Sequence, residues 1–377
     1  MARLPVALAA CLLSVAACGT SPVPSGTTEP SVIPTASTSP TDSPTASPSP
    51  SPVTGWFLLP TQASMGAAHL KDIATFRGAL VVIGSTDPGV NGIWSSTDAM
   101  AWMSIAAPAV LAGFRLMSIA VGDPGIVIVG ESDTAAIAVV SADGIAWSRH
   151  VLPNSHRGSS AVSVAWARGR YLAVGGGGEV NATVAWTSVD GLVWAPLPIL
   201  TRGEPASLSS VAAGPSAFVI DGMEGGQPVI WTSRDARTWT KDTLPGSPND
   251  DAGRMRYTGG RFIFSIIGGG LWSSTDGQHW ANTVVPGFGV GAFDVTAIPG
   301  GFVAVGRSFE DNQPGAVAVA DANLTHWRVL PSDPVFDGGI AASVTVSPDG
   351  AYVVGVGFQI ENRCVFLFAD PSRLLTQ

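Results

Sequence analysis

The sequence predicts an all-β protein in which seven similar units of four short strands follow one another. The first observation is composition, because 45 Gly and 29 Pro among 377 residues mark far more turns than a helical protein tolerates. The second is a tryptophan repeat, and the third is a pair of turn motifs that recur with it. With 46% hydrophobic and 12% charged residues, most of the chain is expected to fold.

The tryptophans define the repeat. Seven of them stand roughly 46 residues apart, and several precede a short segment that ends in proline. These marker residues are Trp56, Trp102, Trp147, Trp194, Trp239, Trp280 and Trp327. A second series precedes four of the markers by one short turn: Trp94, Trp186, Trp231 and Trp272. Because the two series include every tryptophan except Trp166, we expect the rings to pack between neighbouring units.

A tight turn lies just before most of the marker tryptophans. Typical copies read Ser-Ala-Asp-Gly at 141–144 and Ser-Thr-Asp-Gly at 274–277. Asp and Ser side chains can bond the backbone of such a turn, and Gly accepts a positive φ. We therefore assign a structural role to the acidic residue of each copy: Asp98, Asp143, Asp190, Asp235 and Asp276, with Asn323 in a sixth copy that has drifted.

A second turn lies upstream in each unit and is followed by a β-rich run, such as ALVVIG at 79 or FVAVG at 302. These turns begin at Arg77, Asp123, Arg168, Gly214, Gly259, Pro299 and Pro348. Each unit therefore contains four strands: the strand before this turn, the β-rich run after it, the strand before the Asp motif and the strand after that motif. Seven such units describe a seven-bladed β-propeller.

From Trp56 to its C-terminus the chain resembles the Asp-box, or BNR-repeat, β-propellers, a group that includes sialidases, sortilin-type receptors and a photosystem assembly factor. The usual motif of that group is Ser-x-Asp-x-Gly-x-x-Trp. In this sequence Gly directly follows Asp and one residue is missing, which places the chain in a divergent branch.

The ends of the repeat predict how the ring closes. Residues 56–60 form the one marker segment with no strands of its own before it, and the final unit lacks a marker segment. We expect residues 56–60 to supply the outermost strand of the last blade, which removes two free sheet edges.

The first 18 residues resemble a bacterial lipoprotein signal. A basic start at Arg3 and an apolar stretch lead to Val15-Ala16-Ala17-Cys18, which is similar to a lipobox. This resemblance implies diacylglycerol on Cys18 and an extracytoplasmic location on a bacterial membrane, held through the lipid alone. The alternative is an ordinary secretory signal whose cleavage site contains a cysteine.

Three segments follow from these patterns: 1–18 as signal and lipidation site, 19–55 as a stalk, and 56–377 as the propeller. The stalk is rich in Ser, Thr and Pro, so it is expected to stay extended and to form no core. Cys364 is then the one cysteine left in the folded part, where its apolar neighbours predict a buried side chain.

Several classes of chemistry are disfavoured. A net charge of −9 and a pI near 4.9 repel phosphate backbones, so no nucleic-acid partner is expected. The five histidines form no close cluster with one another or with cysteine, which predicts no metal site. No cofactor motif is present, and we expect a monomer.

Candidate binding residues are charged or polar side chains on the segments that enter the innermost strands: Asp72, Arg115, Arg157, Arg254, Arg256, Tyr257 and Asp294. Acidic residues recur between the second and third strands, including Glu131, Asp133, Asp221 and Glu224, which predicts a negative outer rim. We interpret the protein as a non-catalytic binding or assembly scaffold for a protein or carbohydrate ligand. The alternative is a sialidase-like glycoside hydrolase, for which the resemblance requires a tyrosine nucleophile. Two of the three tyrosines lie in apolar runs, and Tyr257, which follows Arg254 and Arg256 at the start of an innermost strand, is the remaining candidate.

Overall fold

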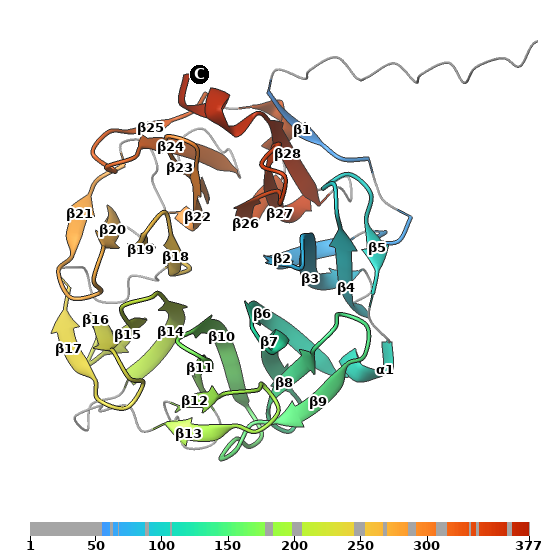
Figure 1. Ribbon diagram of the computed structural model, residues 1–377, viewed down its shortest axis with the longest axis vertical. Helices are drawn as coiled ribbons and strands as arrows, with labels where there is room; N and C mark the ends of the chain where they lie inside the picture. Colours follow the sequence, from blue (N-terminus) through green and yellow to red (C-terminus); the bar gives the residue numbers. More distant parts are fainter. Residues whose placement is uncertain are drawn as a thin grey trace, which may run out of the picture. The chain divides into compact units, whose positions relative to one another are not determined.

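The described strands form seven four-stranded antiparallel sheets arranged in a ring, which confirms the predicted propeller (Figure 1). The computed structural model describes residues 55–60, 63–66, 68–86, 90–105, 108–177, 184–197, 206–244, 253–266, 270–285, 292–306, 315–331, 333–336, 339–359 and 364–376. Cys18 and the predicted stalk up to residue 54 lie outside these ranges.

Each blade runs from an innermost strand at the axis to an outermost strand at the rim. Blade 1 consists of β2(Ala68–Phe76), β3(Ala79–Thr86), β4(Val90–Ser96) and β5(Met103–Ser104). Blade 2 consists of β6(Phe114–Gly122), β7(Gly125–Ser132), β8(Ala136–Ser141) and β9(Ser148–Val151). Blade 3 consists of β10(Ser159–Ala167), β11(Arg170–Gly177), β12(Val184–Ser188) and β13(Ala195–Leu197).

Blades 4 to 6 follow the same order. Blade 4 consists of β14(Ala206–Ala213), β15(Phe218–Glu224), β16(Gln227–Ser233) and β17(Thr240–Thr243). Blade 5 consists of β18(Arg256–Thr258), β19(Arg261–Ile266), β20(Gly270–Ser274) and β21(Ala281–Thr283). Blade 6 consists of β22(Ala292–Ile298), β23(Gly301–Gly306), β24(Ala316–Asp321) and β25(Trp327–Val329). Blade 7 combines β26(Gly339–Val346), β27(Tyr352–Gln359), β28(Val365–Ala369) and β1(Trp56–Leu58).

Among the described residues, helical structure is limited to α1(Pro108–Leu111) and two 3₁₀ turns, η2(Pro334–Phe336) and η3(Pro371–Thr376). None of the helices in the described ranges has the length and apolar character needed to cross a bilayer.

The core lies between blades, because each sheet packs both of its faces against a neighbour. Strand β7 illustrates this, since its residues from Gly125 to Gly130 are buried and it needs apolar side chains on both faces. The tryptophans of the second series are buried in these interfaces, with Trp94, Trp186 and Trp231 among the largest enclosed side chains. Cys364 is also buried, 3.8 Å from the sulfur of Met65.

The ring closes as the sequence predicts. Strand β1 pairs antiparallel with β28, and Trp56 lies opposite Phe368 in the register (Figure 1). The indole ring of Trp56 packs against Phe336 at 5.4 Å and against Phe368 at 5.5 Å between ring centroids. A residue from the start of the repeat thereby completes the core of its end.

The turns before the marker tryptophans share one hydrogen-bond pattern. In five of them an Asp Oδ1 accepts from the backbone N–H groups two and three residues further on, as Asp143 does from Ile145 at 2.8 Å and Ala146 at 2.9 Å. The other four are Asp98, Asp190, Asp235 and Asp276. These bonds lower the pKa of all five carboxyls, in Asp235 to about 2.

In the sixth turn the carboxylate that accepts the backbone N–H groups comes from a different position. Asn323 contributes its backbone N–H, and the accepting carboxylate belongs to Asp321, two residues earlier, where the other turns carry serine. The side chain of Asp321 also accepts from Thr325 at 2.7 Å.

Three of the residues predicted for the acidic rim lie in strands and not in loops: Glu131, which is partly exposed at the end of β7, and Asp221 and Glu224. Asp221 and Glu224 lie in β15 and are buried, so the prediction was wrong for them. Asp221 is 2% exposed, and neither of its carboxylate oxygens has a hydrogen-bond partner among the described residues. Burial raises the pKa of Asp221 well above its usual value. Asp221 lies opposite Ser210 in the strand register of blade 4. The residues at the same register position in blades 2, 3 and 6 are Val129, Val174 and Val305.

Strand β1 provides a test of closure. A chain that begins at Trp56 should melt at nearly the temperature of the complete protein. A chain that begins at residue 61 loses β1 and the buried Trp56, and truncation of a buried Trp costs about 3 to 5 kcal/mol. Equal melting temperatures for the two truncated chains, measured by circular dichroism, would contradict closure by β1.

Asp221→Val should stabilise the protein by about 1 to 3 kcal/mol, because it removes an unsatisfied buried carboxyl and restores the residue found in other blades. The pKa of Asp221 is raised in the folded state, so wild-type stability is lost as pH rises from about 4 toward that raised value. The advantage of the variant should therefore grow with pH over this window in urea unfolding. Asp133→Val, at an exposed position, is the control; a loss of stability in Asp221→Val contradicts the assignment.

Candidate functional site

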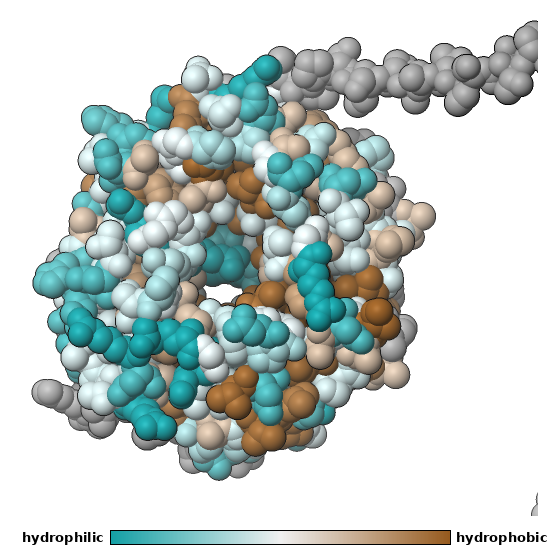
Figure 2. Space-filling model, viewed as in Figure 1, coloured by the Kyte–Doolittle hydropathy of each residue, from teal (hydrophilic) through white to brown (hydrophobic). Residues whose placement is uncertain are grey.

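The candidate site lies where the innermost strands converge on the axis. Figure 2 shows the ring hollowed at its centre, with hydrophilic side chains inside the opening. Six innermost strands carry a register shift at the same place, for example between Leu70 and Asp72 and between Leu116 and Ser118. Such a β-bulge adds one residue to a strand and re-aims the side chains around it.

One position of each blade faces this axis. In six blades it lies in the innermost strand directly after the bulge, and in blade 5 it lies two residues before β18. Across blades 1 to 7 it is occupied by Asp72, Ser118, Ser163, Ser210, Arg254, Asp294 and Ser343. We call this set the axial ring. Six of the seven side chains are at most 7% exposed, and Arg254 is partly exposed.

Four members of the axial ring accept a backbone N–H from the next blade. Asp72 Oδ2 accepts from the backbone N–H of Ile119 at 3.0 Å. The same bond recurs from Val211 to Ser163 at 3.1 Å, from Met255 to Ser210 at 2.9 Å and from Val344 to Asp294 at 3.1 Å. Each of these backbone N–H groups would otherwise be buried without a partner.

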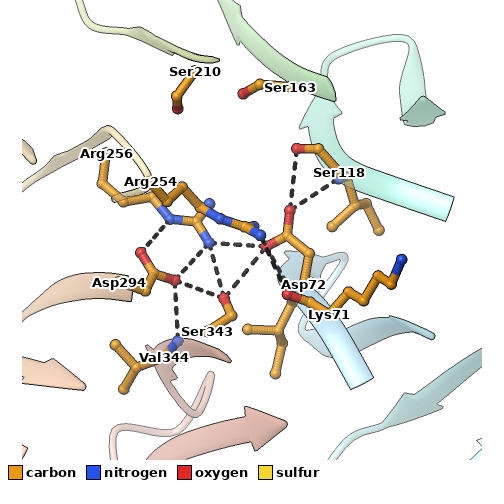
Figure 3. Close-up of polar contacts among 12 residues, drawn as sticks. Lys71, Asp72, Ser118, Ser163, Ser210, Arg254, Arg256, Asp294, Ser343 and Val344 are labelled. Carbon is orange, nitrogen blue, oxygen red and sulfur yellow. Dashed lines mark hydrogen bonds and ion pairs between the residues drawn. The ribbon is translucent and has the colours of Figure 1, made fainter. Parts of the chain in front are cut away.

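Two arginines of blade 5 bridge the carboxylates of the axial ring across the opening (Figure 3). Arg256 bonds Asp294 through Nε and Nη2, both at 2.8 Å, and reaches Asp72 through Nη2 at 2.9 Å. Arg254 forms an ion pair with Asp72 and donates to the backbone oxygen of Lys71 at 3.2 Å. Ser343 donates to Asp294 at 2.6 Å and accepts from Arg256 at 3.0 Å.

Electrostatics favour the charged forms of Asp72 and Arg256. Burial by itself raises the pKa of Asp72, but the positive charges of Arg254 and Arg256 and the bond from Ile119 outweigh it, so the pKa is lowered. Burial likewise opposes the charged form of Arg256, and Asp294 and Asp72 raise its pKa above the ordinary value. Both carboxylates are 0% exposed, so neither is available to a ligand without breaking an ion pair.

A cavity of about 490 Å³ opens beside this network, and we call it the channel pocket. Its cationic side is formed by Lys71 and Arg254, and its hydroxyl side by Ser163, Ser209 and Ser210. The remaining described lining residues are Met117, Ser118, Val162, Gly253, Ile340 and Ala342.

A second cavity of about 680 Å³ lies against blades 1 to 3, and we call it the outer pocket. It contains two predicted binding residues, Arg115 and Arg157, together with Glu131 and Asp133. Arg115 forms an ion pair with Glu131 at 2.7 Å. Lys71 lines both pockets, so it lies between them.

Lys71 is held in place between the pockets. Its ammonium group donates to the backbone oxygen of Leu116 at 3.0 Å, which ties blade 1 to blade 2. Burial and the neighbouring charge of Arg115 lower the pKa of Lys71, while Glu131 opposes that change.

The structure brings most of the predicted binding residues together. Asp72, Arg254, Arg256 and Asp294 form one network, and Arg115 and Arg157 line the adjoining outer pocket. Tyr257 is placed elsewhere: its ring packs on Phe262 at 4.8 Å between centroids.

The sequence interpretation missed Lys71 and the four serines of the axial ring. A signal for the serines exists, because each axial residue stands five residues before a turn residue at the end of the innermost strand. The turn residues are Arg77, Asp123, Arg168, Pro215, Gly259, Pro299 and Pro348. Lys71 is the bulge residue directly before Asp72, and its place in the pockets depends on that bulge.

Comparisons with known proteins show the fold. No family model and no curated protein sequence matches the chain. Among solved structures it is similar to YCF48 from Cyanidioschyzon merolae, with 16% identity, a TM-score of 0.58 and coverage of 84% of this chain and 99% of that one. The chain has a seven-bladed β-propeller fold.

Two further structures have the same fold and different functions. One is YCF48 bound to D1 peptide, with 17% identity, a TM-score of 0.58 and coverage of 84% and 96% of the two chains. The other is the GH74 xyloglucanase from Xanthomonas campestris, with 15% identity and a TM-score of 0.57. That match covers 84% of this chain and 56% of the enzyme, so this propeller spans about half of it.

Among the described residues, no group of three or more His, Cys, Asp or Glu side chains is placed to hold a metal ion.

The ionic network provides a stability test. Asp294→Asn removes the charge that pairs with Arg256, and breaking a buried ion pair costs about 3 to 5 kcal/mol. Glu131→Gln breaks the partly exposed pair with Arg115 and should change stability by less than about 1 kcal/mol. Urea unfolding measures both values; a loss in Asp294→Asn no greater than in Glu131→Gln would show that the network does not hold the ring.

Proposed function

We propose that this protein is a non-catalytic binding module that takes an exposed segment of a protein ligand into the channel and outer pockets. The observation that carries the proposal is a pair of neighbouring cavities that share Lys71 and are lined by fixed charges and hydroxyls. Together they offer a concave, largely preformed surface with a few polar groups for orientation, which is the usual character of a ligand site.

The central carboxylates argue against the glycosidase alternative. Glycoside hydrolysis needs one protonated acid and one free carboxylate on opposite sides of the scissile bond. Asp72 and Asp294 are both enclosed and share Arg256, and the pKa of Asp72 is lowered, which disfavours a proton donor. Tyr257, the nucleophile candidate, packs its ring on Phe262.

The pocket linings favour a peptide over a saccharide. Phe114 is the one aromatic residue among the described residues that line either pocket, and it is 2% exposed. A sugar ring would therefore find no exposed aromatic face there. Peptide binding by this fold has a precedent in the YCF48 structure with D1 peptide, and the likeness is one of fold alone.

Location completes the proposal. The Ser-Asp turns before the marker tryptophans support a divergent Asp-box propeller, and the lipobox-like segment at Cys18 supports a lipid anchor outside the cytoplasm of a bacterium. A binding module held near a membrane surface would meet exposed segments of membrane or extracytoplasmic proteins.

The binding proposal is tested by selecting peptides from a random display library on the purified protein. Selected peptides should bind the wild type and bind Arg115→Glu/Lys71→Glu at least about tenfold more weakly, because both charges line the pockets. Arg237→Glu, an exposed change in a turn of blade 4, is the matched control and should bind like wild type.

Two results would overturn the proposal. One is selected peptides that bind the double variant and the wild type equally. The other is turnover of chromogenic sialosides or of xyloglucan that is lost in Tyr257→Phe, because that result establishes a hydrolase.

The anchor is tested separately. Cys18→Ser should move the protein from the membrane fraction to the aqueous fraction, since a lipid supplies the attachment in this proposal. A variant that stays in the membrane pellet with its signal removed contradicts lipidation at Cys18.

A further inference from the structure

The channel pocket has an imbalance of charge. Lys71 and Arg254 line it, and none of its described lining residues is acidic. The nearest carboxylates, Asp72 and Asp294, are 0% exposed and are already bound to the arginines. Arg254 and Arg256 balance Asp72 and Asp294 in the ion-pair network. Lys71 donates to a backbone oxygen and forms no ion pair with a described residue, so its charge is the one in excess.

We propose that the channel pocket binds one carboxylate group of the protein ligand, between Arg254 and Lys71 on one side and the hydroxyls of Ser163 and Ser210 on the other. This inference rests on the proposed function, because it names the chemical group that the module recognises.

The hydroxyl groups of Ser163 and Ser210 are placed to donate hydrogen bonds into the channel pocket. Ser163 and Ser210 are 7% and 4% exposed, and each accepts a backbone N–H from the next blade. Neither hydroxyl donates to a described residue, so each keeps one proton for an acceptor in the pocket. Figure 3 shows both serines on the side of the channel opposite Lys71, with Arg254 between them.

The cationic side is fixed in advance. Arg254 is held by its ion pair with Asp72 and by the backbone oxygen of Lys71. The ammonium group of Lys71 is held by Leu116. Preorganised donors bind an anion without the entropy loss of ordering long side chains, and charge-assisted hydrogen bonds are the strong ones.

The count of charges favours a carboxylate over a phosphate. A carboxylate carries one negative charge and neutralises the single excess cation, whereas a phosphate dianion would leave a net negative charge beside the buried carboxylates Asp72 and Asp294. Two carboxylate oxygens also match the arrangement, one for the cations and one for the hydroxyls.

The test compares two N-acetyl-Ala-Ala peptides, one with a free C-terminal carboxylate and one with an amide, by calorimetry on the purified protein at low ionic strength. The carboxylate form should bind at least about tenfold more tightly. Lys71→Met should remove most of that difference, Lys71→Arg should retain it, and Arg237→Met should leave it unchanged. The thermal melting of each variant verifies that it is folded.

The outcomes separate this inference from the proposed function. Equal binding of the two peptides, absence of binding by the carboxylate form, or tighter binding of inorganic phosphate overturns the carboxylate site. Library-selected peptides that still need Lys71 and Arg115, but bind equally with and without carboxyl groups, leave the binding module intact and remove the carboxylate inference alone.

Discussion

The narrow end of each blade imposes the constraint on which the rest of the structure depends. Seven innermost strands must meet around one axis, where their backbone groups cannot reach bulk water freely. The axial ring meets this demand with one polar side chain per blade, and several of these accept the next blade's N–H, as Asp72 accepts from Ile119. Buried polar networks of this kind are stable when every member has its partner, and they then fix a single arrangement.

The axial ring is divided into two halves with different chemistry. Blades 1, 5, 6 and 7 contribute an ionic network around Arg256, while blades 3 and 4 contribute the hydroxyls of Ser163 and Ser210. The ion pairs across the opening occupy the carboxylates of Asp72 and Asp294, whereas the serine hydroxyls and Arg254 line the channel pocket. In the proposed site, Arg254 and the serines therefore both join blades to one another and contact the ligand, through different atoms.

The seven-bladed fold could be predicted from the sequence because the tryptophans and turns repeat, and ring closure could be predicted from the marker segment at Trp56. The residues of the candidate site could be predicted only in part. Asp72, Arg254, Arg256 and Asp294 stood out as charges near strand starts, but their association depends on a ring that brings residues 72 and 256 together. Asp221 was misjudged because an acidic residue ending an apolar run looks like the start of a loop, whereas β15 continues to Glu224.

Closure by β1 also determines how the propeller responds to force. Strand β1 has three residues and is attached to the rest of the sheet through β28 alone. The chain before Trp56 continues directly from this strand, so tension along that chain acts on the β1–β28 hydrogen bonds before it reaches any other blade. A mechanical load on the N-terminal side would detach Trp56 from Phe336 and Phe368 first, and would open the ring at one defined seam.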